Sequence, residues 1–106
     1  MVTLEQKFYK LAKQWKEDTM FLSDPNAIYD NSYYKEIISL GPDVIPIIFK
    51  ELQRKIDFWF EALRQLTGEE PYIAKEDWGR VKVIAEAWLK FGKIKGYIKD
   101  EEKEDN

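Results

Sequence analysis

Proline and glycine divide this chain into short segments, and this punctuation limits the folds that it can adopt. Breaks fall at Pro25, at Gly41-Pro42 and between Gly68 and Pro71, because proline cannot continue a helix and glycine readily adopts the positive φ that ends one. Between the breaks, apolar residues recur three or four positions apart, which is the period of an amphipathic helix, and no segment alternates as a strand does. The sequence predicts an all-α fold, a compact irregular bundle of about five helices.

Local signals at the ends of the segments indicate where the helices begin and end. Thr3 with Gln6 forms a capping box at the first start, and Asp43 and Asp57 are suited to cap the third and fourth helices. A loop of about ten residues is expected between the first two helices. The expected helices cover residues 4–22, 32–40, 44–52, 58–67 and a last segment from near Asp77 to Gly92 or Gly96.

The chain contains neither cysteine nor histidine. The first absence excludes disulfides, thiol nucleophiles and cysteine zinc sites, and the second excludes histidine-dependent acid–base catalysis and histidine metal ligands. Adjacent carboxylates at Glu69-Glu70 and Glu76-Asp77 are the remaining candidates for acid–base or metal chemistry, but neighbours in a loop rarely hold two carboxyls across a cleft. We expect no cofactor, no metal site and no catalytic residue, and a carboxylate- or metal-dependent enzyme ranks third among the functional hypotheses.

The formal charge of −3 belongs to the C-terminal end of the chain. Residues 99–106 hold five acidic side chains and two lysines, whereas residues 1–98 hold fifteen side chains of each sign. We expect residues 1–98 to form a single helical domain and residues 99–106 to form an acidic, flexible tail. The longest uncharged runs are six residues, against roughly 20 needed to span a bilayer, and no signal-peptide pattern begins the chain. We expect a cytoplasmic protein without a membrane partner.

The fourth expected helix carries more rings than one face can bury. On a helical wheel Trp59 and Ala62 share a face, whereas Phe60 points about 100° away from Trp59. Phe60 either packs between two helices or belongs to an exposed apolar patch, and such a patch indicates a partner surface. Our first functional hypothesis is a non-enzymatic protein–protein interaction module, adaptor or regulatory, that binds a protein partner or a second copy. Its expected contact residues are Phe60, Arg64, Tyr72 and Trp78.

Four lysines of the first expected helix provide an alternative. They recur at intervals of three, so they sweep around the helix opposite its apolar stripe and do not form one row. A basic face favours a nucleic-acid-binding accessory protein, whose affinity would fall steeply with salt. A solvated helix face without any ligand explains the same pattern. The residues are Lys7, Lys10, Lys13 and Lys16.

A set of landmark residues resembles a family of small uncharacterised bacterial proteins. The landmarks are Trp59-Phe60-Glu61-Ala62-Leu63, Thr67-Gly68-Glu69-Glu70-Pro71, Trp88-Leu89-Lys90-Phe91-Gly92 and Gly96-Tyr97. They form the pattern WFxAL…TGExP…WLxxG…GY, and the resemblance covers most of residues 4–98. It implies a helical fold and brings no activity, substrate or cofactor. Residues 40–48 are also similar to the turn and second helix of a HEAT-type unit, which implies one HEAT-like helical hairpin within the bundle.

Overall fold

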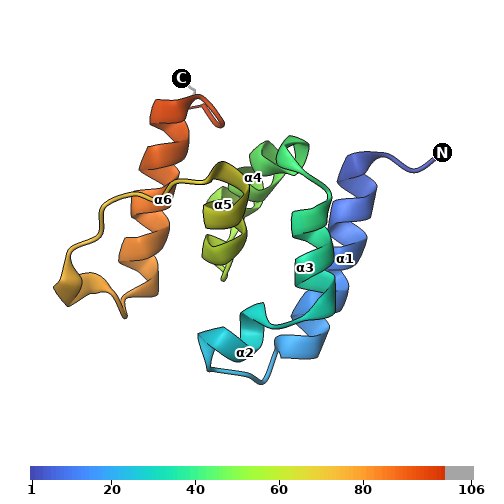
Figure 1. The fold of residues 1–106 in the computed structure, drawn as a ribbon, viewed down its shortest axis with the longest axis horizontal. Coiled ribbons are helices and arrows are strands. Elements are labelled where there is room, and N and C mark those ends of the chain that lie inside the picture. Colours follow the sequence, from blue (N-terminus) through green and yellow to red (C-terminus); the bar gives the residue numbers. More distant parts are fainter. Residues whose placement is uncertain (100–106) are drawn as a thin grey trace.

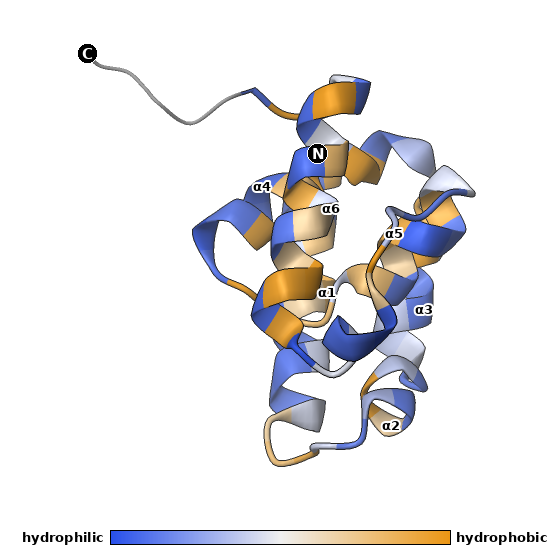
Figure 2. Cartoon of the chain, turned by 90° about the vertical axis from the view of Figure 1, so that its left-hand side faces the viewer, coloured by the Kyte–Doolittle hydropathy of each residue, from blue (hydrophilic) through white to orange (hydrophobic). Residues whose placement is uncertain are grey.

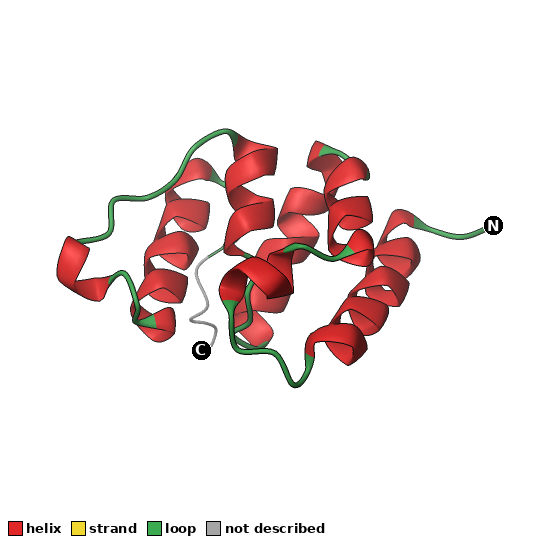
Figure 3. Ribbon diagram, turned by 60° about the horizontal axis from the view of Figure 1, so that its bottom comes forward, coloured by secondary structure: helices red, strands yellow, loops and turns green. Residues whose placement is uncertain are grey.

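The computed structural model describes residues 1–99, and every regular element in this part of the chain is helical. The fold is therefore all-α, as the sequence predicts (Figure 1). Figure 3 shows the helices joined by connections of very different length. In chain order the elements are α1 (Leu4–Thr19), α2 (Pro25–Tyr29), α3 (Ser32–Ser39), the 3₁₀ turn η1 (Pro42–Val44), α4 (Ile45–Arg54), α5 (Phe60–Thr67), the 3₁₀ turn η2 (Lys75–Asp77) and α6 (Val81–Lys95).

The helices pack as an irregular bundle. α1 and α3 lie side by side and run in opposite directions, α5 packs on α3 and α4, and α4 packs on α6 (Figure 1). The Gly41-Pro42 turn joins α3 to α4 as expected, but each of these helices packs chiefly against other elements. The expected HEAT-like hairpin is thus present as a turn between two helices and not as a closely packed pair.

The start of α1 agrees with the prediction, but its end does not. The Gln6 backbone N–H donates to Thr3 Oγ1 at 3.0 Å and the Thr3 N–H donates to Gln6 Oε1 at 2.9 Å, which completes the capping box. α1 ends at Thr19. Leu22, which the predicted apolar stripe included, lies beyond the helix and is 45% exposed.

The loop predicted after α1 contains the short helix α2, which we did not predict from the sequence. The Asp24 side chain accepts a hydrogen bond from the Asn26 N–H at 3.0 Å, and Pro25 occupies the first helical position, where its missing N–H is no loss. Ile28 is buried, and its carbonyl accepts a hydrogen bond from Trp15 Nε1–H at 3.0 Å. α2 therefore closes one end of the core, and its Asp-Pro start is the signal that could have predicted it.

α4 begins without the predicted cap. Residues Pro42–Val44 form a 3₁₀ turn, α4 starts at Ile45, and no side chain caps it, so the prediction that Asp43 caps this helix is wrong. Pro46 falls at the second helical position, where its missing N–H would have had no partner within the helix. The inner face of α4 is buried, as predicted for a central helix.

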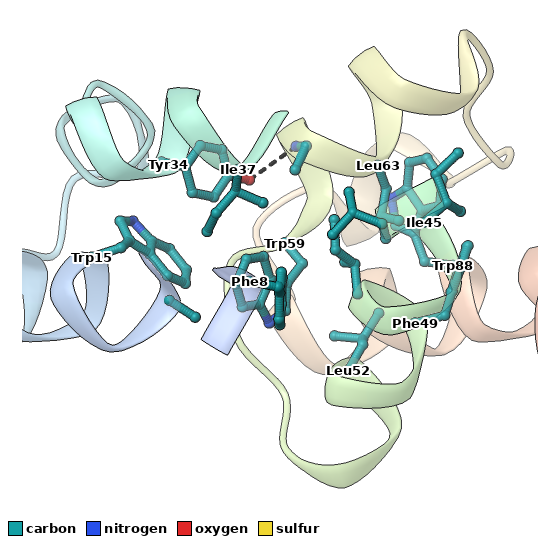
Figure 4. Packing of buried hydrophobic residues seen from close by; sticks show 14 of the residues in the cluster. Phe8, Trp15, Tyr34, Ile37, Ile45, Phe49, Leu52, Trp59, Leu63 and Trp88 are labelled. Atoms are coloured by element: carbon teal, nitrogen blue, oxygen red, sulfur yellow. Dashed lines mark hydrogen bonds between the residues drawn. The ribbon is translucent and has the colours of Figure 1, made fainter. Parts of the chain in front are cut away.

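α5 starts at Phe60, later than predicted, and its cap comes from another helix. Asp57 accepts the Phe58 N–H at 2.8 Å, but this bond joins neighbouring residues ahead of α5 and reaches no N–H of the helix. The Tyr34 hydroxyl of α3 accepts the Ala62 N–H at 2.9 Å, the dashed line in Figure 4, and donates to the Phe58 carbonyl at 3.0 Å. Burial raises the pKa of Tyr34 well above its ordinary value, so the hydroxyl stays protonated and keeps both bonds.

The substitution Tyr34→Phe is expected to lower the free energy of unfolding by about 1–3 kcal/mol, because it leaves the buried Ala62 N–H without an acceptor while keeping the ring. Urea unfolding followed by circular dichroism measures the loss. Tyr33→Phe is the matched control, since the Tyr33 hydroxyl has no hydrogen-bond partner among residues 1–99. It should change stability by less than about 0.5 kcal/mol. Equal losses for the two variants would contradict the capping role.

α6 starts at Val81 because η2 occupies the predicted first turn. The helix continues through Gly92 to Lys95, and Gly96, whose φ is 85°, caps its end. Gly92 therefore lies inside the helix. A Cβ atom built on Gly92 would lie 2.8 Å from both Cδ1 and Cε1 of Phe49. Glycine is needed at this position because α6 approaches α4 too closely for a side chain.

Aromatic rings form much of the core, which extends from α1 to α6 (Figure 4). Trp59 is fully buried, and its ring centroid lies 5.3 Å from that of Phe8, 4.6 Å from that of Trp15 and 6.1 Å from that of Tyr34. Its Nε1–H has no hydrogen-bond partner within the described residues. A second group of rings surrounds Phe49 between α4 and α6.

Near its C-terminal end the described chain packs Tyr97 and Ile98 against this core. The tail expected at residues 99–106 lies, apart from Lys99, outside the described residues. Within residues 1–99, no helix combines the length and the hydropathy that a bilayer crossing requires.

Candidate functional site

The connection between α5 and α6, residues 68–80, presents two large aromatic side chains to solvent. Tyr72 is 88% exposed and Trp78 is 65% exposed. The connection is nevertheless held in place by polar contacts: Trp78 Nε1–H donates to the Ile73 carbonyl at 3.1 Å, and Arg80 pairs with Asp77 at 3.2 Å. We call residues 68–80 the aromatic loop.

The other two predicted contact residues, Phe60 and Arg64, lie on α5. Phe60 is half-buried against the core, with its ring centroid 6.2 Å from that of Phe58. Arg64 is exposed and pairs with Glu61. Hydrogen bonds to Glu61 raise the pKa of the Arg64 guanidinium, and the charge of Glu70 on the aromatic loop adds to this effect.

The structure does not gather the four predicted contact residues on one surface. Figures 1 and 3 both show η2 on the side of α6 that faces away from α5. Trp78 directly follows η2, so it lies apart from Phe60 and Arg64 on α5. Of the predicted contact residues, Phe60 and Arg64 thus lie on α5, and Tyr72 and Trp78 lie on the connection that follows it.

A second apolar surface, which we did not predict from the sequence, lies at the end of α1. Met20 is 66% exposed, Phe21 is 91% exposed and Leu22 is 45% exposed, and Ile56 in the α4–α5 connection is 41% exposed. The turn between α1 and α2 accordingly carries hydrophobic colour at the bottom of the view in Figure 2. The signal was present in the sequence as three consecutive apolar residues directly before the Ser-Asp-Pro break. We call Met20, Phe21, Leu22 and Ile56 the α1-end surface.

Glu51 of α4 is a charged side chain held in the interior, at 3% exposure. It accepts two hydrogen bonds of 2.9 Å from Arg54 and one of 3.2 Å from the Tyr9 hydroxyl, and Lys16 Nζ lies 3.6 Å from its Oε2. The hydrogen bonds from Arg54 lower the pKa of Glu51, so the carboxylate is charged at neutral pH. Because its partners belong to α1 and α4, the Glu51 carboxylate ties these two helices together.

The four lysines of α1 do not share one face. Lys16 reaches Glu51 on the side of α4, whereas Lys7 and Lys10 line a groove with Glu36 of α3. Residues nine apart on a helix point in opposite directions, which separates Lys7 from Lys16. Nucleic-acid binding by these lysines stays a prediction, which a filter-binding titration at low salt tests, since phosphate contacts are strongest there.

The predicted carboxylate candidates are partly engaged in ion pairs. Glu69 pairs with Lys95 at 3.0 Å and Asp77 pairs with Arg80. The described part of the chain contains no cluster of three or more acidic side chains that could hold a metal ion.

A groove between α2, α3 and α5 brings Tyr29 near acidic side chains. Burial, followed by the charges of Glu61 and Asp57, raises the pKa of Tyr29 to about 12. A phenol with this pKa stays protonated at neutral pH and is a poor general base. The Tyr29 phenol is therefore not matched to proton transfer at neutral pH.

Comparison of the chain with protein-family models, with curated proteins and with solved structures found no match. The resemblance to a family of small bacterial proteins stays a prediction. Several of its landmark residues have packing roles in this fold: Trp59 fills the core, Gly92 allows α6 to approach Phe49, and Gly68 and Gly96 end helices with φ of 73° and 85°.

Proposed function

We propose that this chain is a non-enzymatic protein-interaction module of the cytoplasm, adaptor or regulatory, that binds its protein partner through Tyr72 and Trp78 of the aromatic loop. The observation that supports it is the exposure of both rings on a connection that is otherwise held by hydrogen bonds and ion pairs. Large apolar side chains that the core does not use are typical of interaction surfaces.

A loop that is already held in one conformation before binding favours a higher affinity. Fixing a flexible segment on binding costs conformational entropy, so a loop that is already held loses less when a partner arrives. Tyrosine and tryptophan add large contact areas with few rotatable bonds, and tryptophan, tyrosine and arginine are enriched among interface residues that dominate binding energy. The Glu69–Lys95 pair ties the start of the loop to α6, and the Asp77–Arg80 pair spans Trp78 within the loop.

The partner is identified by photo-crosslinking from position 72 and position 78, with position 94 as the control site. Ile94 is 73% exposed on α6 and has no part in the proposed surface. Adducts with one defined protein should form from positions 72 and 78 and not from position 94. An identical set of adducts from all three positions would contradict the proposal.

Binding of the purified partner then measures the contribution of each ring. Tyr72→Ser and Trp78→Ser are each expected to weaken the affinity at least tenfold, which corresponds to about 1.4 kcal/mol. Ile94→Ser should leave the affinity unchanged. Because both rings are exposed, the variants should keep the wild-type circular dichroism. Wild-type affinity in both loop variants would rule out the aromatic loop as the binding surface.

A further inference from the structure

The α1-end surface is separate from the aromatic loop and calls for its own explanation. Met20, Phe21 and Leu22 directly follow the end of α1 and are exposed. Ile56 in the α4–α5 connection is a fourth exposed apolar residue of this surface. A contiguous exposed patch of about 300–600 Å² is the scale at which a monomer's largest patch is often functional. Met20 at 66% and Phe21 at 91% exposure are the most exposed of the four side chains.

A groove lies directly beside the most exposed of these residues. It has a volume of about 280 Å³, and its walls come from α1, α2 and the α4–α5 connection. Met20 and Leu22 line this groove, whereas Phe21, the residue between them, stands outside it with 91% of its surface exposed. The lining residues are Lys16, Thr19, Met20, Leu22, Ile28, Lys55, Asp57 and Phe58.

Phe21 is exposed beside a groove whose lining combines apolar side chains with Lys55 and Asp57, so the ring and the groove of two copies can meet across a two-fold axis. Phe21 cannot enter the groove of its own chain, because its neighbours Met20 and Leu22 form the wall. A two-fold rotation places the ring of one copy opposite the groove of the other, and the second contact follows by symmetry. One surface thus supplies both halves of an isologous interface.

The charges at the groove also fit a second copy. Lys55 has no ion-pair partner among residues 1–99, and Asp57 has no cationic partner there. A surface shaped for an acidic or a basic partner would carry one sign of charge, whereas this one carries both. Opposite charges on one self-complementary face pair with each other when two copies meet.

We propose that two copies of this chain associate through the α1-end surface, with Phe21 of each copy in the groove of the other and Lys55 of each copy facing Asp57 of the other. This interface is independent of the aromatic loop and leaves Tyr72 and Trp78 open for a different partner.

Sedimentation equilibrium of the full chain from about 10 μM to about 1 mM covers the range of weak association. Wild-type protein should show a monomer–dimer equilibrium, and Phe21→Asp should weaken it at least tenfold with unchanged circular dichroism, since the ring is exposed. Ile94→Asp introduces the same charge at an exposed apolar residue of α6 and should leave the dimer intact. A wild-type monomer at about 1 mM, or a dimer unaffected by Phe21→Asp, would overturn the proposal.

Charge exchange tests the pairing of Lys55 with Asp57. Lys55→Asp places two carboxylates opposite each other and should weaken the dimer, and the double variant Lys55→Asp/Asp57→Lys should recover it. Failure of Lys55→Asp to weaken association would overturn this arrangement. Binding of monomeric wild-type protein to phosphatidylglycerol vesicles, lost in Phe21→Asp, would assign the surface to lipid and would also overturn the proposal.

Discussion

The substitution Gly92→Leu is expected to lower the free energy of unfolding by about 3 kcal/mol, the upper end of the usual cost of overpacking. Even the first added atom would lie 2.8 Å from two carbons of the Phe49 ring. That ring cannot move aside easily, because it is fully buried and stacks on Tyr97 with a centroid separation of 5.5 Å. Urea unfolding followed by circular dichroism gives the difference.

Gly92→Ala tests the same contact with a smaller group. Alanine favours a helix interior over glycine by about 1 kcal/mol, so the overlap with Phe49 works against a gain, and we expect a net loss. Gly79→Ala is the matched control, since a Cβ there meets nothing within 4 Å and the residue lacks a positive φ. A Gly92→Leu protein as stable as wild type would show that α4 and α6 separate freely.

The substitution Trp59→Ala is expected to cost about 3–5 kcal/mol, the range for removing a buried tryptophan from a core. Trp59 contacts rings from α1 and α3 at the start of α5, so its loss opens a cavity where three helices meet. Unfolding should be followed by circular dichroism, because the substitution also removes a fluorophore.

Trp78→Ala is the control for Trp59→Ala, since it removes the same side chain from an exposed position and should change stability by less than about 0.5 kcal/mol. Trp59→Phe separates shape from polarity. Trp59→Phe keeps a ring in the core and removes the buried N–H that has no partner among the described residues. The loss in free energy of unfolding should therefore be smaller than for Trp59→Ala, and smaller than the volume of the removed atoms alone predicts. Equal losses for Trp59→Ala and Trp78→Ala would contradict the central place of Trp59.

Signals that act within a few residues predicted the fold well. The Thr3–Gln6 capping box depends on two residues three positions apart, the glycine at the end of α5 depends on its own φ, and both are found as predicted. Helix starts were less predictable. α5 has no cap in its own segment because Tyr34 supplies it from α3, and no local pattern encodes that bond.

The role of Gly92 also could not be predicted from the residues of its own segment. Glycine near the end of an apolar stripe reads as a helix stop, and the alternative Gly96 has that role in the structure. The reason for Gly92 lies on α4, in the ring of Phe49. A reading of one segment at a time has no access to that contact.

The exposure of the candidate surface residues could be predicted from the sequence, but their positions relative to one another could not. Tyr72 and Trp78 follow the helix-ending Gly68, and their exposure agrees with their position outside the helical stripes. η2, which Trp78 directly follows, is separated from α5 by α6, and this separation is a property of the topology. Leu22 was predicted to lie in the first helix because its spacing continues the apolar stripe of α1 past Thr19, the residue at which the helix ends.

The cap that Tyr34 gives to α5 also affects the order in which the chain can fold. α5 has eight residues, and isolated helices shorter than about 12–15 residues are marginal in water. Its first turn gains its hydrogen-bond acceptor only after α3 has docked, from a residue 28 positions earlier in the chain. The first turn of α5 is thus completed by assembly, when this helix packs on α3.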